Sequence, residues 1–264
     1  MMPITGATRL FAILADPIAQ VRTPQGLNAL MAERGTDGVM VPMHVGAAEL
    51  TEVVRGLRQM RNFGGCIVTV PHKKAILGLV DEASPRAQAI GAANAVRREP
   101  DGRLVADMLD GLGFVEGLRG AGLPPAGRSV FLAGAGGAGN AIAFGLAEAG
   151  IARLTIHNRT EATARDLAAR LRASFPSLPV AAGSDPSDHD LAVNATALGM
   201  KPGDPAPFDL LRLTPEMTVA EVIMAPEMTP MLSHAAATGC RIHKGAPMLA
   251  AQLGLMAAFL GMTR

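Results

Sequence analysis

The sequence predicts an α/β protein built around two mainly parallel β-sheets. Short β-rich runs alternate with stretches that carry apolar residues at helical spacing along most of the 264-residue chain. Such alternation is typical of parallel strands covered by helices. A run of Gly and Pro, GAGLPP at residues 120–125, interrupts the alternation. Because Gly and Pro clusters break regular elements, this run predicts a boundary between two domains.

The first domain is expected to start with three strands and two intervening helices. The strands are residues 10–14, 39–45 and 66–70, and the helices are residues 24–34 and 47–61. A short helix is expected after Lys73, as far as residue 82, and another over residues 113–119. The turn sequence Pro-Asp-Gly at residues 100–102 separates the β-rich runs 95–98 and 103–106 and predicts a hairpin at the sheet edge.

The second domain is expected to begin with a glycine-rich turn. Residues 129–133 predict a buried strand, and Gly134, Gly136 and Gly139 follow it in G-x-G-x-x-G spacing, where a helix over residues 138–149 starts. The first glycine permits a tight turn, the second lets the backbone approach a pyrophosphate, and the third lets helix and strand pack closely. This order predicts a dinucleotide site of the Rossmann type. The alternative is a purely structural turn, because many buried strands end in glycines without binding a ligand.

The residues after the next strand, 153–157, bear on the choice of dinucleotide. An NAD site usually carries an acidic residue at this exit, whereas this chain has Asn158-Arg159-Thr160. Arg159 would attract the extra phosphate of NADP, so the sequence favours NADP, with NAD as a possibility. Glu161 weakens this interpretation, and the alternative is an exposed arginine that binds nothing.

The rest of the second domain continues the alternation. Strands are expected over residues 178–182, 191–194, 218–223 and 241–243, and helices after Thr160 and over residues 230–237. The last helix, residues 246–260, is apolar almost all round and is predicted to be buried. Its one long polar side chain, Gln252, either bonds to the backbone or points into a cleft between the domains.

Composition excludes several classes of protein. A net charge of +1, no Tyr, no Trp and eight Phe offer little to a nucleic acid. No stretch reaches the ~20 apolar residues of a membrane span, and the N-terminus lacks the pattern of a signal peptide. With Cys66 and Cys240 as the two cysteines, we expect a cytoplasmic protein. The six histidines have no metal-binding spacing, so no metal is expected. His72, between Pro71 and Lys73, is expected to be a surface residue at a helix start.

Motifs from both halves, taken in order, resemble those of the shikimate dehydrogenase family over essentially the whole chain. TVPHK at residues 69–73 is similar to the family's T-V-P-x-K, GAAN at 91–94 to its G-A-x-N, and DGLG at 110–113 to its D-G-x-G. GAGGAG at 134–139 and NRT at 158–160 are similar to its cofactor motifs. Further matches are NAT at 194–196, GM at 199–200, Pro226 with TP at 229–230, and residues 245–252.

The resemblance implies a division of labour between the two domains. An N-terminal α/β domain, residues 1–122, would bind the substrate, and a Rossmann domain, residues 123–245, would bind NAD(P), with the active site in the cleft between them. The C-terminal helix, within residues 246–264, is expected to pack back towards the substrate domain.

The resemblance also implies roles for individual residues. Lys73 and Asp110 correspond to the family's catalytic pair, close enough to exchange protons with the substrate hydroxyl. Hydride leaves a carbinol carbon only as its hydroxyl proton is removed, so a titratable group is needed at that oxygen. Taken alone, Lys73 could be a solvated lysine at a helix start and Asp110 a helix cap. The implied substrate-binding residues are Thr23, Thr69, Asn94 and Gln252. The implied cofactor-binding residues are Gly134, Ala135, Gly136, Gly137, Ala138, Asn158, Arg159, Thr160, Ala195, Thr196, Val222 and Gly245.

The chain departs from the family at several substrate positions. Val21 stands where the family has the first serine of S-x-S, whose hydroxyls bind the substrate carboxylate, and Thr23 retains the second hydroxyl. Ile67 and Met108 stand at positions where the family often has Asn, Leu109 where it has Thr, and Met224 where it has Tyr. Because a site that hydrogen-bonds a polar group discriminates through those bonds, we expect a lower preference for shikimate.

Three hypotheses follow. The first is an NADP-dependent oxidoreductase that acts on a hydroxylated cyclic acid or a related small molecule. The second is a shikimate or quinate dehydrogenase proper, as in aromatic amino acid biosynthesis by the shikimate pathway, with Thr23 and Arg22 holding the carboxylate. The third is a non-catalytic NAD(P)-sensing protein. A monomer or a homodimer is expected in each case.

Overall fold

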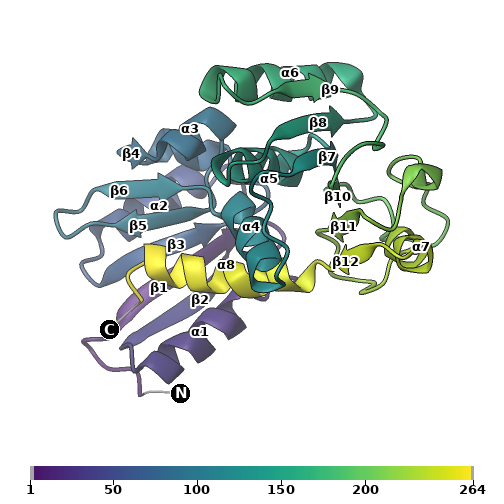
Figure 1. Cartoon of the computed structure of the whole chain (residues 1–264). Helices are drawn as coiled ribbons and strands as arrows, with labels where there is room; N and C mark the ends of the chain where they lie inside the picture. The colour runs from purple at the N-terminus through teal and green to yellow at the C-terminus, as the bar shows by residue number, and fades with distance from the viewer. Residues whose placement is uncertain (1–2, 263–264) are drawn as a thin grey trace. The chain divides into compact units, whose positions relative to one another are not determined.

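The chain folds into two compact units, each of which contains a six-stranded sheet (Figure 1). The computed structural model describes residues 3–262. Unit 1 comprises residues 3–109 and 253–262, and unit 2 comprises residues 110–252. The domain limits expected from the sequence stay predictions.

The sheet of unit 1 is mixed, with both parallel and antiparallel pairs of strands. Its strand order is β2-β1-β3-β5-β6-β4. The parallel part contains β1 (Arg9–Ala15), β2 (Gly38–His44) and β3 (Phe63–Val68), connected by α1 (Thr23–Arg34) and α2 (Leu50–Gln59). All six residues of β3 are buried, as expected of a central strand covered on both faces. The expected alternation of strands and helices in this region is confirmed.

The predicted hairpin forms, but it is not at the sheet edge. β5 (Ala95–Arg98) pairs antiparallel with β6 (Leu104–Asp107), and the short β4 (Glu82–Ala83) then pairs with β6 from the other side. The prediction of an edge hairpin is therefore wrong, because a two-residue strand is too short to leave a periodic signal.

Two other local elements of unit 1 differ from expectation. The short helix after Lys73 is a 3₁₀ helix, η1 (Ala75–Leu79). A helix that the sequence interpretation missed, α3 (Pro85–Ile90), follows β4. Ser84 is its N-cap and accepts a hydrogen bond from Ala87 N at 3.1 Å. Ser-Pro therefore starts a helix here, since Pro is favourable in a first helical turn.

The exposed edge of β2 is covered by a side chain of α1. Asn28 Oδ1 accepts from Met40 N at 2.8 Å, and Asn28 Nδ2 donates to Met40 O at 2.9 Å. Two residues further along the strand, Pro42 has no N–H to offer. These features protect an edge strand against pairing with another strand, and they also fix α1, which begins at Thr23.

The sheet of unit 2 is parallel throughout, in the order β12-β11-β10-β7-β8-β9. From β7 (Ser129–Ala133) the chain moves outward through β8 (Arg153–His157) to β9 (Val180–Ala182). It then returns to the other side of β7 and continues through β10 (Leu191–Asn194) and β11 (Thr218–Glu221) to β12 (Arg241–His243). The direction reverses beside β7, and ligands of such sheets bind at the reversal, beyond the carboxyl ends of the strands.

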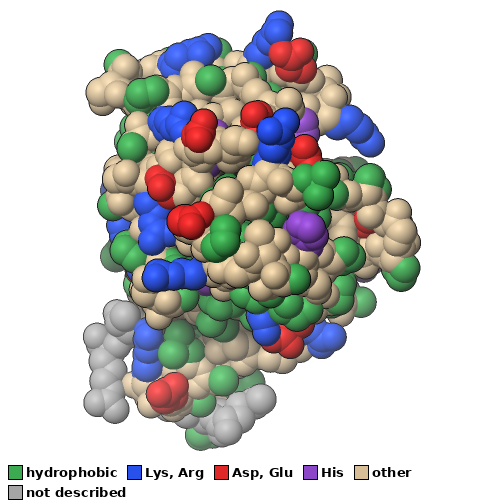
Figure 2. Space-filling view, turned by 45° about the vertical axis from the view of Figure 1, so that its right-hand side comes forward, with side chains coloured by type: hydrophobic (Ala, Val, Ile, Leu, Met, Phe, Trp, Pro, Cys, Tyr) green, Lys and Arg blue, Asp and Glu red, His purple; other side chains and the backbone are tan. Residues whose placement is uncertain are grey.

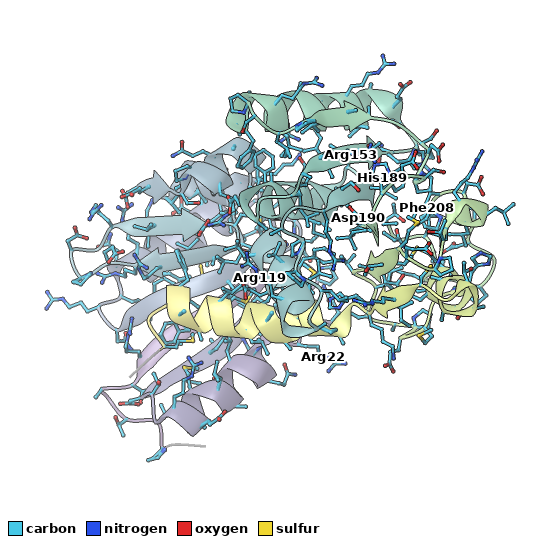
Figure 3. All side chains as sticks on the ribbon, viewed as in Figure 1. Arg22, Arg119, Arg153, His189, Asp190 and Phe208 are labelled. Carbon is cyan, nitrogen blue, oxygen red and sulfur yellow. The ribbon has the colours of Figure 1, made fainter. Side chains whose placement is uncertain are left out.

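Helices and aromatic side chains cover this sheet. The helices are α5 (Gly137–Glu148), α6 (Glu161–Ser174), α7 (Pro230–Thr238) and the one-turn η2 (Leu210–Arg212). Phe131 on β7 packs against His189 and Phe208, with ring centroids 5.8 and 5.3 Å away. Figure 3 labels His189 and Phe208 in this unit. β11 ends at Glu221, earlier than expected, because its partner β10 ends at the opposite residue, Asn194.

Glycines bring α4 (Asp110–Gly120) and α5 into close contact within unit 2. A Cβ atom on Gly111 would lie 1.9 Å from Ala141 O, and one on Gly145 would lie 2.6 Å from Gly111 O. Real Cβ atoms do not approach backbone atoms so closely, so both positions require glycine. The predicted helix at 113–119 therefore begins three residues earlier, at Asp110, because the glycine pair lets its first turn pack against α5.

The final helix, α8 (Ala246–Phe259), begins in unit 2 and ends in unit 1. In unit 1, Leu253 packs against Gly26, and Arg97 donates to Phe259 O at 3.1 Å. None of the helices within residues 3–262 combines the length and the apolar composition that a membrane crossing needs. On the face shown in Figure 2, basic and acidic side chains are interspersed.

Substitution of Gly111 by Ala tests the α4–α5 contact. We expect Gly111→Ala to lower the free energy of unfolding by about 2 kcal/mol, because the new methyl group must displace backbone. Gly120→Ala is the matched control at the other end of α4, where a Cβ meets no atom within 4 Å. Thermal and urea unfolding measure both variants, and equal stabilities of the two would contradict the close contact.

Candidate functional site

The turn that joins β7 to α5, residues 134–139 (the glycine turn), has the geometry that its sequence predicts. Gly134 has a φ of 107°, which strongly favours glycine. A Cβ on Gly139 would lie 2.0 Å from Gly134 O, so this glycine is required for close packing. A Cβ on Gly136 or Gly137 would meet nothing within 4 Å, so space adjoins the backbone at the start of α5. A helix N-terminus with such space suits a pyrophosphate.

The exit of β8 lies beside the glycine turn. Gly134 N donates to His157 O at 2.8 Å, and Asn158 Oδ1 accepts from Ala135 N at 3.2 Å. A cavity of about 340 Å³ is lined here by Ile156, His157, Asn158, Glu161, Ala164, Gly183 and Ser184. Arg159 is exposed and makes no hydrogen bond or ion pair with any residue that the structure describes. Its guanidinium is therefore available for an anionic group such as the extra phosphate of NADP.

The other predicted cofactor residues lie on two pairs of adjoining segments. The segment with Ala195 and Thr196 adjoins the glycine turn, and the segment with Val222 adjoins Gly245. A Cβ on Gly134 would lie 2.9 Å from Ala195 O and 3.0 Å from Thr196 Cγ2. A Cβ on Gly245 would lie 2.3 Å from Ile223 O and 2.8 Å from Val222 C. The predicted cofactor residues thus follow β7, β8, β10, β11 and β12 at one edge of the sheet. Gly137 and Ala138 form the first turn of α5, and Thr160 is the residue before α6.

In unit 1, hydrogen bonds bring two predicted motifs together. Ala93 N donates to Lys73 O at 2.8 Å, so the segments that carry Lys73 and Asn94 adjoin. Asn94 is 1% exposed, and its Oδ1 accepts from Leu109 N at 2.8 Å. Asn94 therefore fixes the backbone just before Asp110. Thr69 directly follows β3, and its N–H donates to Leu14 O at 3.0 Å.

His72, which the sequence suggests is a surface residue at a helix start, is instead 1% exposed. Its Nε2 lies 2.7 Å from Val45 O. Asp16 N donates to Val70 O at 3.1 Å, so two contacts hold the turn that leads to Lys73. The surface interpretation was wrong because nothing local in the sequence shows that the loop after β2 covers this residue.

Sequence reasoning also missed a polar pair at the same edge of unit 1. His44, the last residue of β2, places Nε2 2.7 Å from Asp16 Oδ1 after β1, and both side chains are about half exposed. Thr23, the remaining predicted residue of this unit, is the first residue of α1. The carboxyl ends of parallel strands meet at one edge, and this rule could have placed the pair near Thr69.

In unit 2, a hydrogen bond joins two residues for which the resemblance implies site roles. Asp110 is the first residue of α4 and is 9% exposed, and Gln252 on α8 is 8% exposed. Gln252 Nε2 donates to Asp110 Oδ1 at 2.9 Å. Gln252 thus bonds to a side chain, rather than to the backbone, and it fixes the position of the carboxylate.

The residues at which the chain departs from the family differ in exposure. Ile67 and Met108 are both 2% exposed, Leu109 is 3% exposed, and Met224 is 47% exposed. Val21 lines a largely apolar groove of about 720 Å³ between α1 and β2. None of these side chains brings back the hydrogen-bonding group that the family has at its position.

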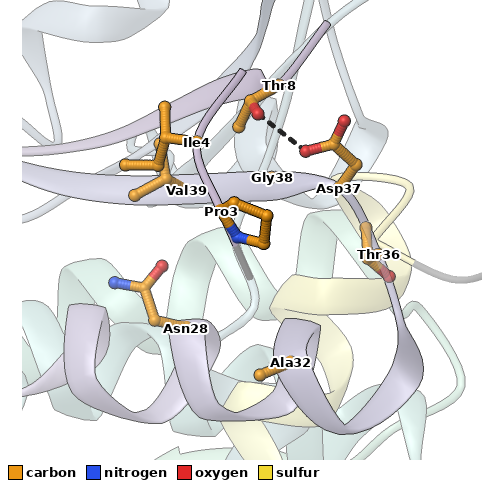
Figure 4. Close-up of a pocket in the computed structure, with 9 residues that line it drawn as sticks. All are labelled: Pro3, Ile4, Thr8, Asn28, Ala32, Thr36, Asp37, Gly38 and Val39. Atoms are coloured by element: carbon orange, nitrogen blue, oxygen red, sulfur yellow. Dashed lines mark hydrogen bonds between the residues drawn. The ribbon is translucent and has the colours of Figure 1, made fainter. Parts of the chain in front are cut away.

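Other cavities and clusters carry less chemistry. A cavity of about 30 Å³ between α1, β2 and the chain before β1 is lined by Thr8, Asn28, Asp37 and six other residues (Figure 4). Thr8 Oγ1 donates to Asp37 Oδ1 there at 2.7 Å. Within residues 3–262, no group of three or more His, Cys, Asp or Glu side chains is arranged to hold a metal ion.

Fold and site together define a nucleotide-binding α/β protein. Its unit 2 carries the sheet reversal, the glycine turn and an available arginine, and its unit 1 carries a lysine and a buried amide on two segments that a backbone hydrogen bond joins. Residues 13–96 match the model of the shikimate dehydrogenase substrate-binding domain. The chain belongs to the shikimate dehydrogenase family, as its relatives establish.

One relative is the shikimate dehydrogenase (NADP(+)) of Geobacter sulfurreducens, 39% identical over 260 residues, which are 95% of this chain and 90% of the relative. A solved structure, shikimate 5-dehydrogenase from Listeria monocytogenes in complex with shikimate and NAD, has a TM-score of 0.91 at 30% identity, covering 99% of this chain and 93% of that one. Another solved structure is the ligand-free form of 5-ketofructose reductase of Gluconobacter sp. strain CHM43. It has a TM-score of 0.89 at 33% identity, and the match covers 96% of this chain and 92% of that one.

Replacement of Gln252 by Glu tests the bond to Asp110. Gln252→Glu places two carboxylates within hydrogen-bonding distance, which raises the pKa of one in the folded protein. The unfolded chain then ionises first as the pH rises, so we expect the variant to match the wild type near pH 4 and to be less stable at pH 8. Gln252→Met, which removes the hydrogen bond without adding charge, is the control. Thermal unfolding across this pH range measures both, and a stability loss in Gln252→Glu that does not grow with pH would contradict the pairing.

Proposed function

We propose that this chain, an NADP-dependent oxidoreductase of the shikimate dehydrogenase family, transfers hydride reversibly between the nicotinamide and the carbinol or ketone carbon of a hydroxylated cyclic acid or a related small molecule. The observation that carries the proposal is the bond between Gln252 and Asp110 in the unit that also holds the glycine turn. It fixes a carboxylate that is 9% exposed, an arrangement suited to handling a proton.

In the proposed reaction Lys73 and Asp110 act on the proton of the reacting hydroxyl. NADP, when bound, supplies the carbon that accepts or gives the hydride. Lys73 removes the hydroxyl proton as hydride leaves the carbinol carbon, and returns it to the oxygen in the reverse direction. Asp110 holds the ammonium group and shares its proton. Thr23, Thr69, Asn94 and Gln252 orient the substrate by hydrogen bonds, so that the reacting carbon is presented to the nicotinamide.

The residues present fit NADP. The start of α5 has open space at Gly136 and Gly137, and Arg159 has no partner among the described residues. Asn158, Arg159 and Thr160 would hold the adenosine phosphate, and the glycine turn would hold the pyrophosphate.

Replacement of Arg159 measures the preference for NADP. We expect Arg159→Ser to raise the Kd for NADP⁺ about tenfold, because one charge-assisted contact is worth roughly 1.5 kcal/mol or more. The Kd for NAD⁺, which lacks the phosphate, should stay nearly unchanged. The control is Arg165→Ser, an exposed arginine on α6 that pairs with Glu161 at 2.6 Å. Equal losses for the two dinucleotides would contradict a phosphate contact.

The substrate is proposed to differ from shikimate, because this chain lacks several of the polar side chains with which the family binds shikimate. Val21, Ile67, Met108 and Met224 replace polar residues of the family, and loss of such hydrogen bonds lowers specificity by orders of magnitude. The family fold also occurs in a protein named 5-ketofructose reductase, so it is compatible with a keto sugar. The names of the relatives favour the second candidate, a shikimate or quinate dehydrogenase proper.

A substrate panel separates the two candidates. Shikimate, quinate and neutral cyclic or linear polyols are offered with NADP⁺ and NAD⁺, and reduced cofactor is followed by absorbance. We expect kcat/KM for shikimate to be at least about a hundredfold below that of the preferred substrate. Shikimate turnover near ~10 per second, an ordinary enzymatic rate, would instead assign the second function.

Replacement of Lys73 separates catalysis from cofactor sensing. We expect Lys73→Ala to lower kcat at least about a hundredfold, since a positioned proton-transfer group contributes that much. Its Kd for NADP⁺ should equal that of the wild type. The control is Lys74→Ala, the exposed neighbouring lysine. If both variants kept full turnover, Lys73 would have no part in the reaction, and if no substrate were turned over at all, the sensing hypothesis would be favoured.

The expected cytoplasmic location and the expected monomer or homodimer stay predictions.

A further inference from the structure

A carboxyl group is buried at the edge of the sheet where the cofactor residues gather. Glu221 is the last residue of β11 and is 0% exposed. Its Oε2 accepts a hydrogen bond from Thr229 Oγ1 at 2.9 Å, and Thr229, itself 0% exposed, caps α7 by accepting from Leu232 N. Glu221 Oε1 has no hydrogen-bond partner among the residues that the structure describes. Neither the sequence motifs nor the proposed reaction gives this acid a role.

The neighbour of Glu221 on β10 is Asn194, which directs a tight turn. Asn194 and Glu221 are register partners at the ends of adjacent parallel strands, so their side chains share one face of the sheet. Asn194 Oδ1 accepts from Thr196 N at 3.0 Å and from Thr196 Oγ1 at 2.7 Å, and its Nδ2 donates to Leu198 O at 3.0 Å. A single buried amide therefore shapes residues 194–198 (the 194–198 turn).

The 194–198 turn lies directly against the glycine turn. Ala195 N donates to Ala133 O at 2.8 Å, and Ala195 O and Thr196 Cγ2 fill the space where Gly134 would carry a Cβ. Gly199, just beyond, packs against Thr229, since a Cβ there would lie 3.4 Å from Thr229 Cβ. A shift of Glu221 or its two partners would thus be passed by direct contact to the backbone that holds the pyrophosphate.

We propose that Glu221 is a positioning residue for the dinucleotide: in its neutral form it holds the 194–198 turn against Gly134 through Asn194 and Thr229, and its ionisation weakens that hold and lowers cofactor affinity. This inference rests on the proposed function in that it assumes a dinucleotide on the glycine turn. It does not depend on turnover or on the substrate.

Burial of Glu221 places its proposed ionisation near neutral pH. Burial raises the pKa of Glu221 to about 7, and the hydrogen bond from Thr229 opposes this rise. Below that pH the neutral carboxyl tolerates an Oε1 without a donor, whereas above it a buried negative oxygen would lack one. Opening of the strand ends to water relieves this cost.

Other titratable groups on the elements around Glu221 are few. They are His243 and Arg241 on β12, whose register partners are Ala220 and Thr218, His234 on α7, and Lys201, Asp204, Glu227 and Lys244 in the adjoining loops. Asp204 accepts hydrogen bonds from Gly199 N and Lys201 N, and Glu227 pairs with Lys244 at 2.6 Å. Burial lowers the pKa of His243, so this ring stays neutral at the pH where Glu221 ionises.

Comparison of the wild type with Glu221→Gln across pH tests the proposal. The Kd for NAD⁺ and for NADP⁺ is measured from pH 6 to 8.5 by fluorescence or calorimetry, because NAD⁺ lacks the titrating phosphate. At each pH the ratio of the wild-type Kd to the variant Kd removes the titrations that both proteins share. We expect this ratio to rise about tenfold between pH 6 and 8, since one pH unit above the pKa corresponds to a factor of ten. Glu216→Gln, an exposed acid before β11, is the control and should give a constant ratio.

A constant ratio for Glu221→Gln, whatever its value, would overturn the proposal and leave the proposed function intact. Absence of dinucleotide binding at every pH would instead reject the proposed function.

Wild-type protein alone gives a second test should Glu221→Gln not fold. If the neutral form binds more tightly, NAD⁺ binding at pH 7.5 takes up a fraction of a proton. Calorimetry in two buffers with different ionisation enthalpies detects this uptake. Zero uptake or proton release would overturn the proposal.

Discussion

Close backbone contact around α5 is the constraint on which the candidate site of unit 2 depends. At the start of α5, Gly139 packs directly against Gly134 O and so closes the glycine turn. Along the side of α5, Gly111 packs directly against Ala141 O, which allows α4 to approach α5 closely. α4 begins with Asp110, so one helix both starts the cofactor turn and fixes the backbone that carries a proposed catalytic carboxylate. Any added side chain at these contacts would displace the backbone of the glycine turn or of the start of α4, because packed backbone cannot compress.

Buried polar side chains at strand ends complete what the glycines begin. Asn94 holds the backbone of Leu109 in unit 1, Asn194 shapes the 194–198 turn in unit 2, and Gln252 holds Asp110. Each is less than one-tenth exposed, so each needs its partners and is immobilised by them. Glu221 is the exception, since one of its oxygens lacks a described partner. Because a carboxyl group titrates and an amide does not, a change of pH acts on this unsatisfied oxygen of Glu221 and leaves the three amides unchanged.

The proposed function combines unchanged reaction chemistry with an altered substrate environment. Lys73, Asp110 and the glycine turn keep the family pattern, and the bonds that fix them are ordinary backbone and amide contacts. The replaced positions are apolar, and most are buried. Hydride transfer and proton removal need few groups in fixed places, whereas discrimination between substrates depends on many hydrogen bonds that can be lost one at a time. Specificity can therefore change while the reaction is kept.

The sequence by itself determined the periodic and motif-based features. Alternating runs predicted the parallel strands, and glycine spacing predicted the turn after β7, because these depend on local backbone geometry. Elements with little local signal, β4 and α3, were missed, and His72 was misplaced on the surface. Only the tertiary structure decided that Gln252 bonds to Asp110, that His72 is buried under the chain after β2, and that Glu221 is buried beside Asn194. Burial and pairing arise between residues far apart in the chain, and spacing along the sequence does not encode them.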